Sequence, residues 1–263
     1  MLVARLVTSL GVWLSPEVYK VLPIMIPFAA RHPHSRGDKA NGISDQWGAP
    51  TPEGYFMDDN SLVKNLVKSL NISSPSSLLN GKRIEKGFVA AHVWQTKSDG
   101  LRSARDPLTY SFIPNVLWLP SDVAKLSDRA GFTQSFLQAL SLSIYRDLEI
   151  QPEATRITSE AWDLLPDSER IPPEALPSLA QLNFFHPKAG WLDQRIAAIE
   201  SIANGLNRVA QGKPLQGKVC STRYTEGIIQ LDPTAAGALA KRLVEYVEGA
   251  RSALHDYPVE LEN

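Results

Sequence analysis

Cysteine is almost absent from this sequence, which contains Cys220 and no second one among its 263 residues. A lone cysteine excludes an internal disulfide and a thiolate cage for a metal ion. Because proteins that depend on disulfides belong to oxidising compartments, the simpler expectation is a reducing, cytoplasmic location.

Long apolar runs are also missing. The most hydrophobic stretch covers residues 1–28, but Arg5, Glu17 and Lys20 interrupt it, so it lacks the roughly 20 consecutive apolar residues that a membrane span requires. We therefore expect a buried helix or strand pair here and no membrane association. A signal peptide is the minor alternative, because residues 6–14 are apolar but no clear cleavage site follows promptly.

The chain has no excess of charge of either sign, since 27 basic and 28 acidic residues leave a formal net charge of −1. This balance excludes a protein that coats nucleic acid or membrane through bulk electrostatics, so any such binding must come from local patches. No repeat of solenoid length and no low-complexity tract is visible.

The pattern of apolar residues predicts an α+β fold that is mainly helical, with helices around a small central β-hairpin or sheet. We expect a first domain in residues 1–150 with the hairpin at 81–120, and an acidic, proline-rich connector at 151–177. A helical region at 178–263 packs on the first domain. Within it, residues 218–224 resemble a short strand.

The centre of the chain holds the most informative pattern. Two apolar runs, residues 87–94 and 111–120, are separated by a polar, basic loop, and a helix start at Ser121 follows at once. The pattern predicts a strand, a loop, a strand and a helix. His92 lies near the end of the first strand and Asn115 lies in the second.

This arrangement suits hydrolysis of a phosphodiester, which needs a base to deprotonate water and a cation to stabilise the charge of the transition state. His92 is the candidate base, and Asn115 across the hairpin is the candidate holder of its ring. The following helix would supply a third polar group. The candidates there, Asp122, Lys125 and Asp128, share one face at spacings of three residues.

His92, residues 114–119 and a helix that contains Lys125 resemble the HNH, or ββα-metal, nucleases, whose second half reads Asn-Leu-x-x-Leu before a short helix. The resemblance covers about forty residues of the chain. It implies a nuclease-like first domain and a metal-dependent DNA endonuclease that takes part in restriction or defence. It also implies a divalent cofactor, Mg²⁺ or Mn²⁺.

Two positions depart from the pattern of this family. The family places a metal-binding acid or histidine just before the base and a histidine or asparagine on the helix, whereas this chain has Ala90 and Ala91 before His92 and Ala124 on the helix. The resemblance therefore implies either a rearranged metal site that uses Asp122 or Asp128, or a scaffold that no longer cleaves.

The loop of the hairpin and the residues before it are basic. Between residues 81 and 105, six basic residues outnumber two acidic ones, Glu85 and Asp99, which leaves a local charge of +4. Such patches bind phosphate backbones, and a nearby tryptophan can stack on a base. The candidate nucleic-acid-binding residues are Lys82, Arg83, Lys86, Trp94, Lys97, Arg102 and Arg105.

A second nuclease arrangement uses overlapping residues. An apolar strand followed by Gln95 and Lys97 resembles half of the PD-(D/E)xK site, in which a carboxylate from Asp58 or Asp59 would share a divalent cation and Lys97 would orient the water. Asp58 and Asp59 equally fit the start of a helix.

Another candidate metal cluster contains His32, His34 and Asp38, but it lacks a third histidine or a cysteine, and a surface loop explains it better. Arg31 and Arg36 in the same loop are candidates for phosphate contacts.

The rival hypothesis is a non-catalytic adaptor. It would bind nucleic acid through the basic loop, or a protein partner through the acidic segment 147–177, which contains eight acidic residues and two basic ones up to residue 174. In this hypothesis His92 is a core residue that is hydrogen-bonded through one nitrogen, and Asn115 shapes a turn.

Overall fold

The computed structural model describes residues 2–84, 86–127, 131–150, 152–169, 171–219 and 221–256. Helix outweighs strand, and the main sheet is mixed, so the predicted α+β class is confirmed. The helices are α1 (Leu2–Leu10), α2 (Pro16–Val21), α3 (Ser61–Leu66), α4 (Ser121–Ser127), α5 (Phe132–Tyr145), α6 (Pro152–Asp163), α7 (Trp191–Ala210), α8 (Thr222–Ile228) and α9 (Pro233–Asp256). The strands are β1 (Val12–Leu14), β2 (Ala29–Arg31), β3 (Phe56–Asp58), β4 (Asn71–Ser73), β5 (Phe88–His92), β6 (Val116–Pro120) and β7 (Asn183–His186).

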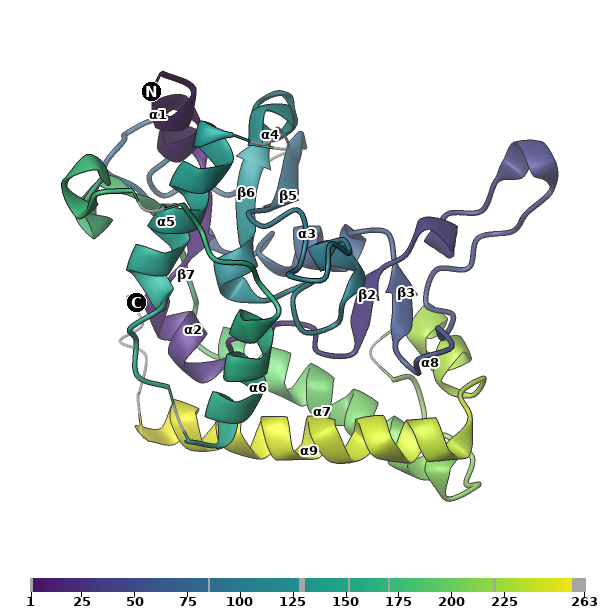
Figure 1. The fold of residues 1–263 in the computed structure, drawn as a ribbon. Coiled ribbons are helices and arrows are strands. Elements are labelled where there is room, and N and C mark those ends of the chain that lie inside the picture. Colours follow the sequence, from purple (N-terminus) through teal and green to yellow (C-terminus); the bar gives the residue numbers. More distant parts are fainter. Residues whose placement is uncertain are drawn as a thin grey trace.

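The centre of the protein is a five-stranded sheet in the order β4-β7-β1-β6-β5. Strand β1 pairs in parallel with β7, and the other three pairings are antiparallel. Strands β1 and β6 are buried along almost their whole length, which explains their uninterrupted apolar sequences. A separate parallel pair, β2 and β3, lies to one side of the main sheet (Figure 1).

Helices cover this sheet from several directions. The long helices α7 and α9 pack along each other, and α6 packs on α9 (Figure 1). Near the amino terminus, α1 packs against α4 and α5. No helix in the described ranges is long and apolar enough to cross a membrane.

The last part of the chain contributes to the central sheet. Strand β7 lies between β4 and β1, so residues from the predicted first domain and from the predicted region 178–263 build one sheet. The predicted connector contains α6, whose Trp162 is buried. The predicted strand at 218–224 is corrected, because α8 starts at Thr222 and its Tyr224 is buried against Phe28 and Phe56.

The predicted strand, loop, strand and helix are present as β5, residues 93–115, β6 and α4. Strands β5 and β6 pair in antiparallel register, with His92 opposite Val116 and Phe88 opposite Pro120. Because α4 begins directly after β6, it lies close to β5. Strand β5 is at the edge of the sheet, so one of its sides is available to form a site.

Candidate functional site

The main cavity of interest runs along the outer edge of β5 and has a volume of about 780 Å³. Its walls come from β2, from the start of α3, from β5, from residues 102–105 and from α4. Asn60 links the wall formed by α3 to the wall formed by β5, since its Nδ2 donates to the carbonyl oxygen of Ala90 at 2.9 Å. We call this cavity the His92 cleft.

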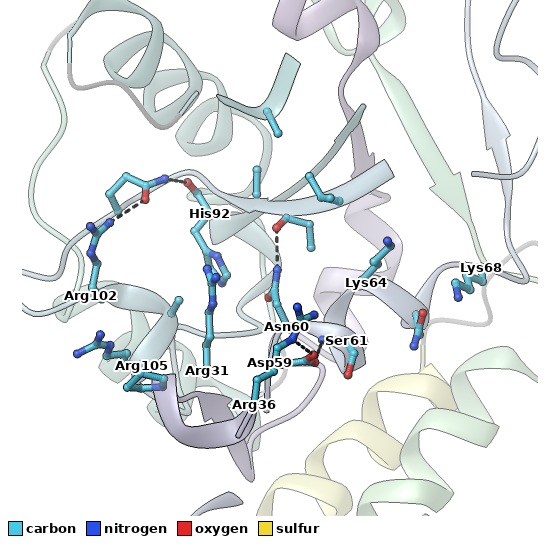
Figure 2. Close-up of a pocket in the computed structure, with 18 residues that line it drawn as sticks. Arg31, Arg36, Asp59, Asn60, Ser61, Lys64, Lys68, His92, Arg102 and Arg105 are labelled. Atoms are coloured by element: carbon cyan, nitrogen blue, oxygen red, sulfur yellow. Dashed lines mark hydrogen bonds and ion pairs between the residues drawn. The ribbon is translucent and has the colours of Figure 1, made fainter. Parts of the chain in front are cut away.

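The His92 cleft is strongly cationic in a chain that is almost neutral. Among the described residues that line it, six are basic and one, Asp59, is acidic. Figure 2 shows Arg102 and Arg105 on one side of His92, and Lys64 and Lys68 on the other. The basic residues are Arg31, Arg36, Lys64, Lys68, Arg102 and Arg105.

Asp59 is held by two neighbours in the cleft. Arg36 Nε donates to its Oδ2 at 2.7 Å, and the backbone N–H of Ser61 donates to its Oδ1 at 3.0 Å. Although burial alone would raise it, these contacts keep the pKa of Asp59 below its usual value. The carboxylate is therefore charged at neutral pH, and it offsets one of the six cations.

His92 lies at the end of β5 and is 7% exposed. Its Nε2 is 2.9 Å from the carbonyl oxygen of Tyr110. Because a carbonyl oxygen only accepts, Nε2 must carry the proton, which leaves Nδ1 as the basic nitrogen. Burial, with a smaller contribution from the charge of Arg31, lowers the pKa of His92 to about 4. The ring is therefore neutral at pH 7.

Tyr110 supports His92 in a second way. The two rings are stacked, with centroids 6.0 Å apart. The Tyr110 hydroxyl donates to Asp58, and the two carboxylate oxygens of Asp58 also accept from Ser61 Oγ at 3.2 Å and from the backbone N–H of Leu62 at 3.2 Å. Burial raises the pKa of Asp58. Asp58 thus connects the support of His92 with the first turn of α3.

Asn115 is fully buried and holds the loop that supports His92. Its Nδ2 donates to the carbonyl oxygen of Thr109 at 2.9 Å and to Ser103 Oγ at 3.2 Å, and its Oδ1 accepts from the backbone N–H of Trp94 at 2.8 Å. The sequence predicted that Asn115 would hold the ring directly. Instead, it fixes the backbone next to Tyr110, and so positions the carbonyl group that binds His92.

Asp122 and Lys125 of α4 do not line the His92 cleft, whereas Ala124 does. Asp122 lines a different pocket, and the exposed Lys125 lines neither of these cavities. Asp128 is outside the described residues. The candidate catalytic residues His92 and Asn115 are therefore linked through one loop, and Lys125 is not part of that arrangement.

Few of the described side chains around His92 are free to bind a divalent metal ion. Such ions take carboxylate, carbonyl or imidazole ligands. In the cleft, Asp59 is paired with Arg36, His92 Nε2 is committed to Tyr110, and Ala90, Ala91 and Ala124 offer no ligand atom. Across the described ranges, no three histidine, cysteine, aspartate or glutamate residues are grouped so that they could hold a metal.

The predicted nucleic-acid-binding residues are in four environments. Arg102 and Arg105 line the His92 cleft, while Lys82, Arg83 and Lys86 line a second pocket. Lys97 forms ion pairs with Asp99 at 3.0 Å and with Asp106 at 3.1 Å. Trp94 is 1% exposed, and its Nε1 donates to the carbonyl oxygen of Pro166. Its predicted stacking on a base is corrected, because the ring has no exposed face.

The alternative site with Asp58, Asp59, Gln95 and Lys97 is only partly assembled. Asp59 and Gln95 line the His92 cleft, and Gln95 Nε2 donates to the backbone carbonyl oxygen of His92 at 2.8 Å. Asp58 is buried under Tyr110, and the ion pairs of Lys97 hold its ammonium group elsewhere.

The candidate cluster of His32, His34 and Asp38 is built from local contacts. The backbone N–H of His34 donates to His32 Nδ1 at 3.3 Å. Asp38 accepts from Asn41 Nδ2 and from the backbone N–H of Ala40. These contacts belong to turns and do not gather metal ligands.

Sequence reasoning did not identify Lys64 and Lys68 as part of the site. Lys64 is on α3 and Lys68 follows the end of this helix, four residues later, so their helical spacing was visible in the sequence, but the packing of α3 against β5 was not. Tyr110 was also missed, because the group that binds His92 is its backbone carbonyl.

Comparisons with protein-family models, with curated proteins and with solved structures give no match to this chain.

Proposed function

We propose that this protein binds nucleic acid, with DNA as the expected substrate, in the His92 cleft and hydrolyses a phosphodiester bond with His92 as the general base. One observation carries the proposal. A neutral histidine, held through Nε2 by a backbone carbonyl, lines a cleft with six basic side chains. This combination supplies a proton acceptor and a binding site for phosphates in one place.

The chemistry assigned to the chain's own residues is simple. Nδ1 of His92 takes a proton from a water molecule while the water oxygen attacks the phosphorus and the bond to the leaving sugar oxygen breaks. The departing oxygen takes its proton from solvent. Cationic side chains of the cleft, such as Arg31 and Arg105, stabilise the negative charge that grows on the phosphate oxygens. A bound phosphodiester also adds negative charge near His92, which raises the pKa of its imidazole toward the range of an effective base.

A non-catalytic nucleic-acid-binding protein is the second candidate, and a specific observation favours it. Ala90, Ala91 and Ala124 line the cleft at the positions where the HNH family carries metal ligands. A protein of this kind would keep the cationic cleft and lack turnover.

One experiment separates the two candidates. Purified wild-type protein, His92→Ala and the control His186→Ala, which changes an exposed histidine on β7, are incubated with plasmid and labelled duplex DNA. Each reaction contains Mg²⁺, Mn²⁺ or a chelator. The proposal expects cleavage by wild type and by the control, and a rate about 10²–10⁴-fold lower for His92→Ala with DNA binding retained. Cleavage that His92→Ala leaves unchanged would exclude His92 as the base. Binding without cleavage in every condition would select the second candidate.

A further inference from the structure

A second basic pocket lies at the other end of the β5–β6 hairpin. It has a volume of about 400 Å³ and is lined by Lys82, Arg83 and Lys86, with Asp122 as an acidic residue on its wall. All three basic side chains are exposed. We call these three residues the hairpin patch.

The hairpin patch and the His92 cleft share one edge strand. Residues 89–92 of β5 line the cleft, while Gly87 and Phe88 line the second pocket. From Phe88 to His92 the strand advances four residues, or about 13 Å at the usual rise. One strand of B-form DNA advances about 3.4 Å per nucleotide, so this length corresponds to roughly four nucleotides.

Short apolar side chains line the stretch of β5 between the two basic groups. Val89, Ala90 and Ala91 carry small side chains and form the stretch of the cleft between His92 and Phe88. Small residues on an edge strand allow a phosphate backbone to approach closely. A nucleic acid that lies along β5 would therefore meet both basic groups.

The backbone that carries the hairpin patch is fixed to the sheet. The N–H of Ile72 on β4 donates to the carbonyl oxygen of Lys82 at 2.8 Å, and the N–H of Gly81 donates to the carbonyl oxygen of Ile72 at 2.7 Å. Arg83 Nε donates to Asn71 Oδ1 at 3.3 Å. Among the described residues, no acidic side chain forms an ion pair with Lys82, Arg83 or Lys86. The backbone of Lys82 and the side chain of Arg83 are thus held, and the three basic side chains are exposed to solvent.

We infer that the hairpin patch is a second phosphate-binding site, which binds the backbone of the same nucleic acid several nucleotides away from the bond at His92. The inference rests on the proposed function and adds a length requirement to it. A short nucleic acid fills the His92 cleft alone, whereas a longer one also contacts the hairpin patch and binds more tightly.

The test compares two DNA lengths and two charge variants. Fluorescence anisotropy measures binding of a labelled dinucleotide, which is too short to span both basic groups, and of a labelled duplex of about 20 base pairs over a series of salt concentrations. The patch variant is Lys82→Gln/Arg83→Gln/Lys86→Gln, and the cleft variant is Arg102→Gln/Arg105→Gln. A charge-preserving control, Lys82→Arg/Lys86→Arg, keeps the hairpin patch positive. Thermal unfolding confirms that each variant is folded.

The inference expects the patch variant to bind the long duplex about 10-fold more weakly, with a salt slope smaller by about 2 to 3, and to bind the dinucleotide like wild type. The cleft variant should weaken both lengths, and the charge-preserving control should bind like wild type. If the patch variant binds both lengths normally while the cleft variant weakens both, the inference is overturned and the proposed function stands. If the long duplex depends on the hairpin patch and neither length depends on the cleft, both proposals are overturned.

Discussion

The residues on the two sides of His92 differ in burial and in charge. Beneath the ring, Tyr110, Asn115 and Asp58 are buried and joined by hydrogen bonds, most of them to backbone groups or to each other. In front of it, the cleft is rimmed by long, charged side chains such as Arg36, whose side chain is 79% exposed. Buried hydrogen bonds fix a geometry, whereas exposed cations bind a ligand at little cost to the fold. Changes beneath the ring should therefore reduce stability, and changes at the rim should reduce binding.

The largest effect on stability should come from Asn115→Ala. The change removes three hydrogen bonds and leaves the N–H of Trp94 and the carbonyl oxygen of Thr109 without their partner. Unpaired buried groups cost about 1–3 kcal/mol each, so the free energy of unfolding should fall by about 3 kcal/mol or more. Urea unfolding of this variant, compared with Asn65→Ala at an exposed position of α3, provides the measurement. A loss below about 1 kcal/mol would show that the buried side is not rigidly fixed by Asn115.

A pH titration tests the burial of His92 on the same side. The folded-state pKa of His92 is about 4, against the ordinary histidine pKa of 6.5, so the unfolded chain binds the proton more readily between these values. The stabilising contribution is fully present above pH 6.5 and is lost as the pH falls to about 4, by up to about 3 kcal/mol. The free energy of unfolding is measured for wild type and for His92→Gln across this pH range. Because the two proteins share all other titratable groups, the contributions of these groups cancel in the difference. A difference that does not vary with pH would mean that His92 is accessible to protons in the folded state.

A smaller loss is expected for Tyr110→Phe. The change removes the donor to Asp58 but keeps the backbone carbonyl that binds His92, so stability should fall by about 1–3 kcal/mol while the Nε2-protonated form of His92 persists. Nitrogen NMR of the histidine rings reports the tautomer separately from stability. Tyr55→Phe is the matched control, because the Tyr55 hydroxyl donates to the carbonyl oxygen of Arg105 in an exposed position. A changed His92 tautomer in Tyr110→Phe alone would show that the hydroxyl, as well as the carbonyl, positions the ring.

The sequence predicts the hairpin better than it predicts the site. Strands β5 and β6 are apolar runs, and Ser121 marks a helix start, so local pattern is sufficient for this element. The pairing of β7 with β1 joins residues about 170 positions apart, and no local signal carries it. The cleft depends on the same kind of contact, because Arg31 on β2, Lys64 on α3 and Arg105 meet only through packing.

The smallest effect on stability and a clear effect on binding should come from Arg102→Gln/Arg105→Gln at the rim. Arg102 makes a contact of 3.4 Å with Gln95. Because Arg102 and Arg105 are both exposed, the free energy of unfolding should change by less than about 0.5 kcal/mol. Loss of two phosphate contacts should lower the slope of the logarithm of the binding constant against the logarithm of salt concentration by about 2.

The charge-matched control, Lys188→Gln/Lys213→Gln, removes two exposed cations that do not line the cleft and should leave the slope unchanged. Equal slopes for the two variants would mean that DNA responds only to net charge. A lower slope for the rim variant alone, with unchanged stability, would show that the rim binds the ligand and contributes little to the fold.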